Sequence, residues 1–107
     1  MTHKLKTVLV VGGGAAGMMA ALAAAERGAR VVVLERMDKA GKKILVTGNG
    51  RCNITNARQD LSRYHGAPAS FTETVLKSFS LAKTLEFFKS IGLECVEEDE
   101  GRVYPSC

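Results

Sequence analysis

The sequence predicts an α/β fold built on a parallel βαβ unit near the start of the chain, and three observations indicate it. Residues 7–11 (TVLVV) and 31–35 (VVVLE) are short apolar runs rich in β-branched residues, which is typical of buried parallel strands. A glycine-rich turn follows the first run, and an alanine-rich segment then leads to the second. A strand, turn, helix and strand within about thirty residues form one crossover unit, which is expected to be right-handed.

The helix of this unit is predicted over residues 15–27. The segment contains seven alanines, two methionines and a leucine, and it has neither proline nor a β-branched residue. This composition favours a helix through intrinsic propensity alone. Three consecutive glycines, Gly12 to Gly14, end the first strand, and Gly28 supplies the expected helix stop.

The rest of the chain is predicted to be less regular. Glycines and asparagines interrupt residues 36–56, which indicates a loop with one short helical turn, and residues 57–69 are polar. Ser70 and Glu73 have the spacing of a capping box, which predicts a helix start at Ser70. A second helix is expected after Ser80, with apolar residues at helical spacing up to Gly92. Residues 93–98 and 102–105 are then expected to form a short hairpin.

Composition limits the classes of protein. The chain has 107 residues, a formal charge of +4 and 46% hydrophobic residues, which excludes a disordered tail and a complete two-domain oxidoreductase. It has no apolar run long enough to span a membrane. The three cysteines, Cys52, Cys95 and Cys107, include no Cys-x-x-Cys pair, so neither a disulfide scaffold nor a metal site is expected. A reduced, cytoplasmic setting fits this cysteine usage.

The turn after the first strand carries the pattern G-x-G-x-x-G at Gly12, Gly14 and Gly17, and Glu35 ends the next strand 18 positions later. This is the context that a Rossmann-like dinucleotide site requires. Gly12 permits the tight turn, Gly14 leaves room for a pyrophosphate, and Gly17 lets the helix approach the sheet. The first helical turn, with Ala15 and Ala16, presents backbone N–H groups to the phosphates.

The residue at position 35 limits which dinucleotide the motif accepts. Glu35 is suited to accept hydrogen bonds from ribose hydroxyls, and its charge disfavours a 2′-phosphate, hence NADP at this position. The motif does not distinguish FAD from NAD. A glycine-rich turn that binds no ligand is the structural alternative.

Basic residues are concentrated in the segment that follows the second strand. Between residues 36 and 58, six basic residues and one acidic residue give a net charge of +5, with Arg36 at its start. Such a loop is able to fold over phosphates, although a solvated basic loop is the simpler alternative. A nucleic-acid patch is also conceivable, but the segment has no aromatic residue to stack on bases.

Three segments carry a more specific resemblance. They are the VVGGGAAGMMAA run, the GKK…TGNGRCNITN block of residues 41–56, and the GRVYP run of residues 101–105. In this order they resemble the BaiN-like family of FAD-dependent, NAD(P)-linked oxidoreductases, also described as aminoacetone-oxidase-like flavoproteins. The resemblance covers essentially the entire chain. The sequence departs from the family pattern at Asn49, where many relatives have glycine or another small residue, and at Thr47, where serine is frequent.

The resemblance implies a flavoprotein of the two-dinucleotide-domain type, with FAD on the βαβ unit and NAD(P)H as the co-substrate of the parent protein. It also implies that the cofactor is approached by Lys43, Gly50, Arg51, Cys52 and Asn53. Cys52, beside Arg51 and an expected helix start, is interpreted as a packing or cofactor contact, with a redox role as the alternative. No residue is assigned as a catalytic acid or base. The predicted partners are FAD and a small-molecule substrate, without nucleic acid or membrane.

The parts of the chain are predicted to form the N-terminal portion of one FAD-binding domain: a βαβ core at 1–36, a cofactor loop at 37–58, and a helical segment with a hairpin at 59–107. Because only two parallel strands are evident, the chain is expected to be an incomplete domain that associates through exposed sheet edges. Three alternatives to the flavin oxidoreductase remain open: an NAD-binding dehydrogenase domain, an RNA-linked flavoprotein module, and a fragment that is inactive as it stands.

Overall fold

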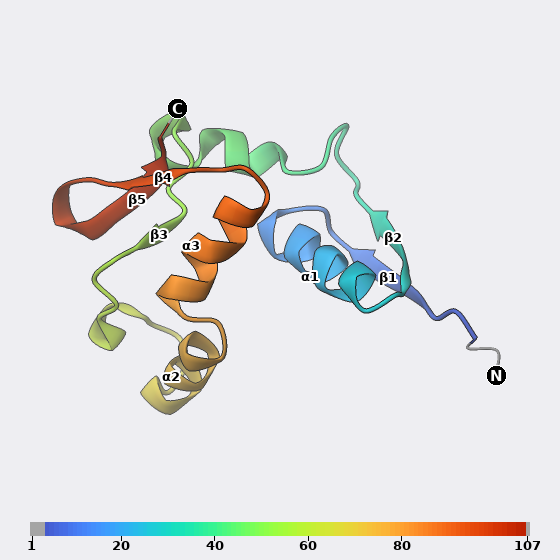
Figure 1. Cartoon of the computed structure of the whole chain (residues 1–107), viewed down its shortest axis with the longest axis horizontal. Coiled ribbons are helices and arrows are strands. Elements are labelled where there is room, and N and C mark those ends of the chain that lie inside the picture. The colour runs from blue at the N-terminus through green and yellow to red at the C-terminus, as the bar shows by residue number, and fades with distance from the viewer. Residues whose placement is uncertain (1–3, 107) are drawn as a thin grey trace. The chain divides into compact units, whose positions relative to one another are not determined.

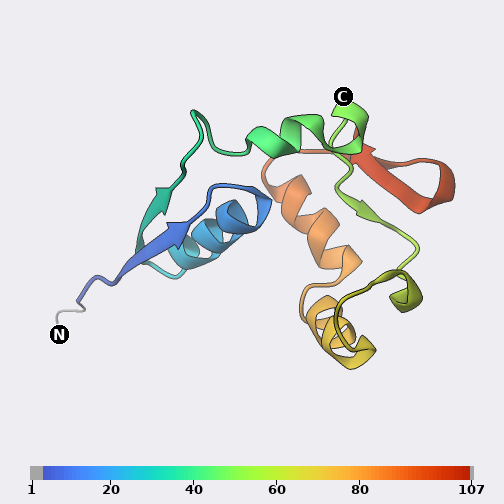
Figure 2. The ribbon, with the colours of Figure 1, turned by 180° about the vertical axis from the view of Figure 1, so that it is seen from behind.

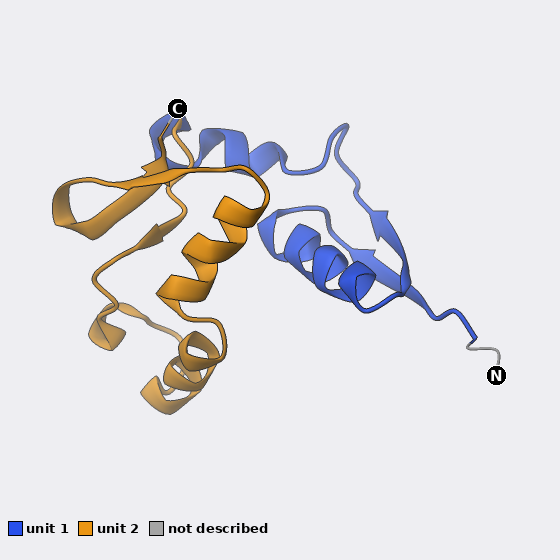
Figure 3. Cartoon of the chain, viewed as in Figure 1, with its two compact units in different colours: residues 1–50 blue, residues 51–107 orange. Residues whose placement is uncertain are grey.

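The computed structural model describes residues 4–106 and divides the chain into two compact units, residues 1–50 and 51–107 (Figure 3). The first unit contains β1 (Thr7–Val11), α1 (Ala15–Glu26) and β2 (Arg30–Leu34). Strands β1 and β2 are parallel neighbours, with Leu9 opposite Val32 in the register. Helix α1 packs against both strands, as Figures 1 and 2 show from opposite sides. The predicted α/β fold of Rossmann-like type is therefore confirmed.

The ends of these elements follow the sequence signals closely. Helix α1 begins at Ala15, directly after the three glycines, and Gly28 ends the helix with φ +87°. The second strand lies one residue earlier than predicted, so Glu35 follows β2 rather than ending it. This shift frees the Glu35 backbone from the sheet, and its side chain contacts the glycine-rich turn.

Apolar side chains of the first unit are widely accessible. Val11 is 85% exposed and Leu9 is 61% exposed, although both belong to β1. Helix α1 is apolar on nearly all sides, and none of its side chains is buried. A helix with this pattern normally lies inside a larger structure.

The second unit contains 3₁₀ turns at Leu61–Arg63 and Asp99–Gly101, helices α2 (Ala69–Ser78) and α3 (Leu81–Ser90), and strands β3 (Thr55–Asn56), β4 (Cys95–Glu97) and β5 (Arg102–Pro105). Helix α3 begins as predicted, because the Ser80 side chain accepts a hydrogen bond from the Lys83 backbone N–H at 3.2 Å. It also ends as predicted: Gly92 adopts φ +90°, and the N–H of Leu93 donates to the carbonyl of Phe88.

The capping box predicted at Ser70 is wrong. Helix α2 begins one residue earlier, and Pro68 occupies the N-cap position without any side-chain cap. The fixed φ of Pro68, −58°, prepares the chain for the helix, and its carbonyl accepts hydrogen bonds from the N–H groups of Phe71 and Thr72. Ser70 thus lies inside the first turn, where its hydroxyl has no capping role.

The predicted hairpin is present and consists of β4 and β5. Strand β5 is also the central strand of a three-stranded sheet. The order of the sheet is β3-β5-β4, with all neighbours antiparallel. The two-residue strand β3 was not predicted, because the sequence indicated a loop there. Strand β5 contains the two buried hydrophobic residues of the described chain, Val103 and Tyr104, so the core of the second unit is centred on this strand.

Within residues 4–106, no helix has both the length and the apolar character needed to cross a bilayer. The same residues contain no cluster of histidine, cysteine and carboxylate side chains arranged to hold a metal ion. Cys107 lies outside the described residues.

Candidate functional site

The glycine-rich turn is held in a conformation that depends on its glycines. Gly12 has φ +102°, a backbone angle that residues other than glycine rarely adopt. A Cβ atom on Gly17 would lie 1.8 Å from the carbonyl oxygen of Gly12, so the helix approaches the turn too closely for any side chain. A Cβ on Gly14, in contrast, would meet no protein atom within 4 Å. The turn is therefore tightly packed behind Gly17 and open in front of Gly14.

Helix α1 starts at this open side. Gly14 is its N-cap residue, and it provides no side chain to accept the hydrogen bonds of the first-turn N–H groups. These groups belong to Ala15, Ala16 and Gly17, and the first two residues are exposed. The start of a helix with free N–H groups and an unneutralised dipole is suited to an anion such as a pyrophosphate.

Glu35 is hydrogen-bonded at both carboxylate oxygens. The backbone N–H of Gly13 donates to Oε1 at 2.8 Å, and that of Met37 donates to Oε2 at 2.7 Å. The hydrogen bond from Met37 has the largest effect on the Glu35 carboxyl, and together with the bond from Gly13 it lowers the pKa below its usual value. The nearby charge of Arg36 lowers this pKa further. Each oxygen keeps a further lone pair, so the carboxylate is still able to accept a ligand hydroxyl.

The lowered pKa predicts a contribution of Glu35 to stability that depends on pH. Because the folded state holds the carboxylate more strongly than the unfolded state, the contribution is complete above the usual glutamate pKa. It is lost as the pH falls through the lower pKa of the folded state. The Glu35→Gln variant should therefore be less stable than the parent chain at pH 7, and the difference should shrink towards pH 3.

Urea unfolding at pH 7, 5 and 3 measures this difference. Glu26→Gln, which removes the same charge from the exposed end of α1, is the matched control. A Glu35→Gln variant whose loss of stability is equal at all three pH values would contradict the prediction.

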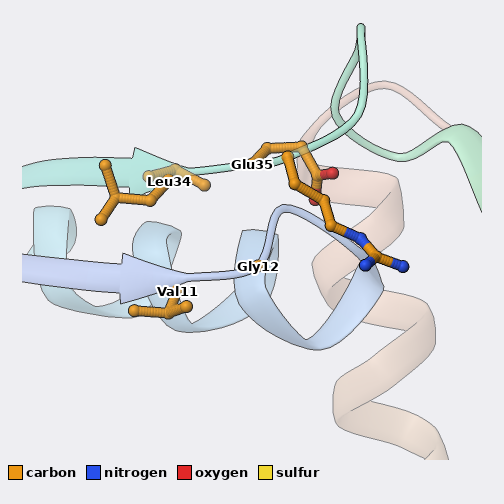
Figure 4. Close-up of a pocket in the computed structure, with 6 residues that line it drawn as sticks. Val11, Gly12, Leu34 and Glu35 are labelled. Atoms are coloured by element: carbon orange, nitrogen blue, oxygen red, sulfur yellow. The ribbon is translucent and has the colours of Figure 1, made fainter.

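A hollow of about 630 Å³ lies at the carboxyl ends of the two parallel strands. In Figure 4, Val11 and Gly12 lie at the end of β1, while Leu34 and Glu35 lie at the end of β2. Val33 and Arg36 complete the lining. In open α/β sheets, ligands bind outside the carboxyl ends of the strands. The hollow therefore brings together apolar side chains of both strands, the glycine-rich turn at Gly12 and the Glu35 carboxylate.

The segment that returns from β2 is tied to the same turn. The N–H of Gly41 donates to the carbonyl of Gly13 at 2.7 Å. Helical turns of 3₁₀ type then span Lys42–Gly50, interrupted by non-helical residues from Thr47 to Asn49. Lys42 pairs with Asp38 at 2.9 Å. The predicted Lys43 and Gly50 are both exposed, and Gly50 has φ +85°.

The other predicted site residues lie in the second unit. Arg51 donates to the carboxylate of Glu98 through both terminal nitrogens, and its guanidinium lies 4.2 Å from the centre of the Tyr104 ring. The side-chain amide of Asn53 donates to the carbonyls of Val103 and Thr55. Cys52 is only partly exposed.

The expected helix start at Cys52 is wrong. Cys52 adopts φ +59° and lies between the 3₁₀ segment and β3, outside any helix. The helix-start argument for a redox role of Cys52 is therefore lost.

The predicted residues of the glycine-rich turn and of the end of β2 lie close together in the first unit: Gly12, Gly14, Ala15, Ala16, Gly17, Glu35 and Arg36. In the second unit, Arg51 and Asn53 bond to the hairpin, and Cys52 lies between them in sequence. Contact of these residues with a cofactor stays a prediction. Sequence reasoning missed Glu98 and Tyr104, which contact Arg51. Glu98 is one of several acidic residues between positions 94 and 100, so the only signal for its pairing is the general preference of arginine for carboxylates.

Several known proteins resemble the chain over most of its length. The chain is 50% identical over 98 residues to a 3-dehydro-bile acid delta(4,6)-reductase of Clostridium scindens. It is 30% identical over 96 residues to a ribosomal RNA dihydrouridine synthase of Escherichia coli, and 28% identical to that of Haemophilus influenzae. Each match covers 90% of the chain and 24% of the relative, so the chain spans about a quarter of these proteins. The model of the HI0933-like protein Rossmann domain matches residues 6–107, and the chain therefore belongs to this family.

Proposed function

We propose that the chain binds FAD on its βαβ unit and forms the FAD-binding part of a flavin-dependent oxidoreductase. The observation that carries the proposal is the arrangement at the start of α1. An open space in front of Gly14, uncapped N–H groups and a carboxylate fixed at the end of β2 occur at one edge of the sheet. The pyrophosphate and the adenosine ribose of a dinucleotide require these three features.

Each residue has a defined task in this proposal. The N–H groups of Ala15 and Ala16 hold the pyrophosphate, and Gly14 leaves room for it. Glu35 accepts hydrogen bonds from the ribose hydroxyls, and Arg36 and Lys43 add positive charge near the phosphates. When bound, FAD would supply hydride transfer, and the protein would supply orientation and electrostatics. No acid or base of the described chain is assigned to proton transfer.

The names of the relatives support reduction as the class of reaction. One relative is a reductase by name, and the other two form dihydrouridine. The higher identity to the bile acid reductase favours a small-molecule substrate over RNA. We infer that NAD(P)H is the source of hydride for the whole protein and that the protein acts in the cytoplasm. Association of the chain through the edges of the two-stranded sheet is a further part of the proposal.

Reconstitution with FAD tests the proposal. The purified chain should take up FAD in a stoichiometric complex, quench the flavin fluorescence and show flavin absorbance after removal of free cofactor. FAD should also raise its melting temperature more than NAD does. Titration with the ribosomal RNA at two salt concentrations tests the alternative, since binding to RNA would weaken steeply with salt. A chain that takes up no FAD, or prefers NAD, would contradict the proposal.

A further inference from the structure

The segment after Gly50 contains a residue in an unfavourable conformation. Cys52 has φ +59°, in the left-handed region that residues with a Cβ atom seldom occupy. Gly48, Asn49 and Gly50 before it also have positive φ, but glycine and asparagine tolerate this region better. Such a conformation persists only where the surroundings enforce it, and it is frequent at functional sites.

The two neighbours of Cys52 supply this enforcement. Before it, the Arg51 guanidinium forms a two-pronged ion pair with Glu98, 47 positions away in sequence, and lies over the Tyr104 ring. After it, the Asn53 side chain donates to the carbonyl of Val103 at 3.0 Å. The backbone of Ile54 also donates to that carbonyl, at 2.9 Å. Cys52 is therefore held between two attachments to the hairpin.

The hairpin is itself well suited to serve as the support. Tyr104 and Val103 are its buried residues, with exposed fractions of 8% and 3%. At its turn, a Cβ on Gly101 would lie 2.6 Å from Oδ1 of Asn56, and the carbonyl of Gly101 accepts a bond from the N–H of Ala57. The ring on which Arg51 rests is thus fixed by the core of the second unit.

We propose that Arg51, Glu98 and Tyr104 are positioning residues, which together hold Cys52 and its neighbours in the shape that the cofactor requires. The cofactor part of this inference rests on the proposed function, that the chain binds FAD, and on the family resemblance of the sequence, which implies that residues 50–53 approach the cofactor. Arg51 acts through the loop that it fixes, and Glu98 and Tyr104 act through Arg51. Both terminal nitrogens of Arg51 bond to Glu98 and the flat guanidinium lies over the Tyr104 ring, and lysine is unable to reproduce these contacts.

Reaction of Cys52 with iodoacetamide, in the absence of FAD, tests the fixed loop directly. Mass spectrometry of the peptide that contains Cys52 separates its modification from that of Cys95. Glu98→Ala and Arg51→Lys should each raise the modification rate about fivefold, because the thiol becomes accessible when the loop opens. Glu97→Ala removes the same charge from the residue directly before Glu98 and should leave the modification rate of Cys52 unchanged. The exchanged pair Arg51→Glu with Glu98→Arg should restore much of the protection.

The FAD complex tests the role towards the cofactor. Glu98→Ala and Arg51→Lys should weaken FAD binding about fivefold and change the shape of the flavin absorption bands, whereas Glu97→Ala should do neither. Unchanged modification rates in both variants would overturn the inference that Arg51 and Glu98 hold the loop around Cys52. Faster modification with unchanged FAD affinity and flavin spectrum would overturn the positioning role. A parent chain that takes up no FAD would overturn both the proposed function and this positioning role. The reaction of the Cys52 thiol would still test whether Arg51 and Glu98 hold the loop, because it is measured without FAD.

Discussion

The Gly17→Val variant is expected to lose about 3 kcal/mol of its free energy of unfolding, because no rearrangement within the turn accommodates a side chain there. Even the first atom of that side chain would lie 1.8 Å from the Gly12 carbonyl oxygen, and 3.4 Å from a methyl group of Val10. The first contact is with backbone, which cannot swing aside as a flexible side chain would. Helix α1 would have to move away from β1, at the expense of the packing between them.

Urea unfolding followed by circular dichroism measures this loss. Ala23→Val is the matched control, since it introduces the same residue on an exposed position of the same helix. The control should cost only about 0.6 kcal/mol, the difference in helix propensity. Equal losses in the two variants would show that the close approach of α1 to the turn is not required.

The Gly14→Val variant should behave in the opposite way, with a stable fold and weak binding of FAD. Gly14 has φ −80° and ψ −167°, an extended conformation that valine adopts readily. Its added side chain would meet no protein atom, and it would instead occupy the space in front of the N–H groups of α1. We expect FAD affinity to fall about a hundredfold, which corresponds to about 2.8 kcal/mol of binding free energy.

Fluorescence titration with FAD measures this effect, and the melting temperature of the free chain verifies that the fold is kept. Gly14→Ala should give an intermediate affinity, because its single methyl group fills less of the space. Ala23→Val again serves as the control and should bind FAD like the parent chain. A Gly14→Val chain with unchanged affinity would place the pyrophosphate elsewhere and remove the main support for the proposed function.

Where a signal is local, the sequence was sufficient to predict the structure. The strands on either side of α1, the helix stop at Gly28 and the cap at Ser80 each depend on residues within a few positions of one another. The competition between Pro68 and Ser70 for the start of α2 was also local, and there the wrong residue was favoured. The helix begins directly after Pro68, which takes the N-cap position without a side-chain cap, so Ser70 falls inside the first turn.

Contacts between distant segments were beyond such reasoning. Strand β3 has only two residues, and it exists because the backbone of Thr55 and Asn56 pairs with β5, about fifty positions later. The ion pair of Arg51 with Glu98 has a similar separation, and neither residue differs in character from the other charged residues nearby. For the site, the spacing of the glycines and Glu35 predicted the turn, but not the bonds from Gly13 and Met37 that fix the carboxylate.

The bonds at Gly13 have a consequence for the length of the loop that follows β2. The N–H of Gly13 donates to the Glu35 side chain, and the carbonyl of Gly13 accepts from the N–H of Gly41, so the chain between residues 35 and 41 forms a ring closed on the single residue Gly13. Extra residues inside this ring would cost little loop entropy, because closure depends only weakly on length. An insertion near Lys39 is therefore expected to disturb the fold less than one between Gly12 and Gly17, where the close approach of α1 to the Gly12 carbonyl fixes the spacing.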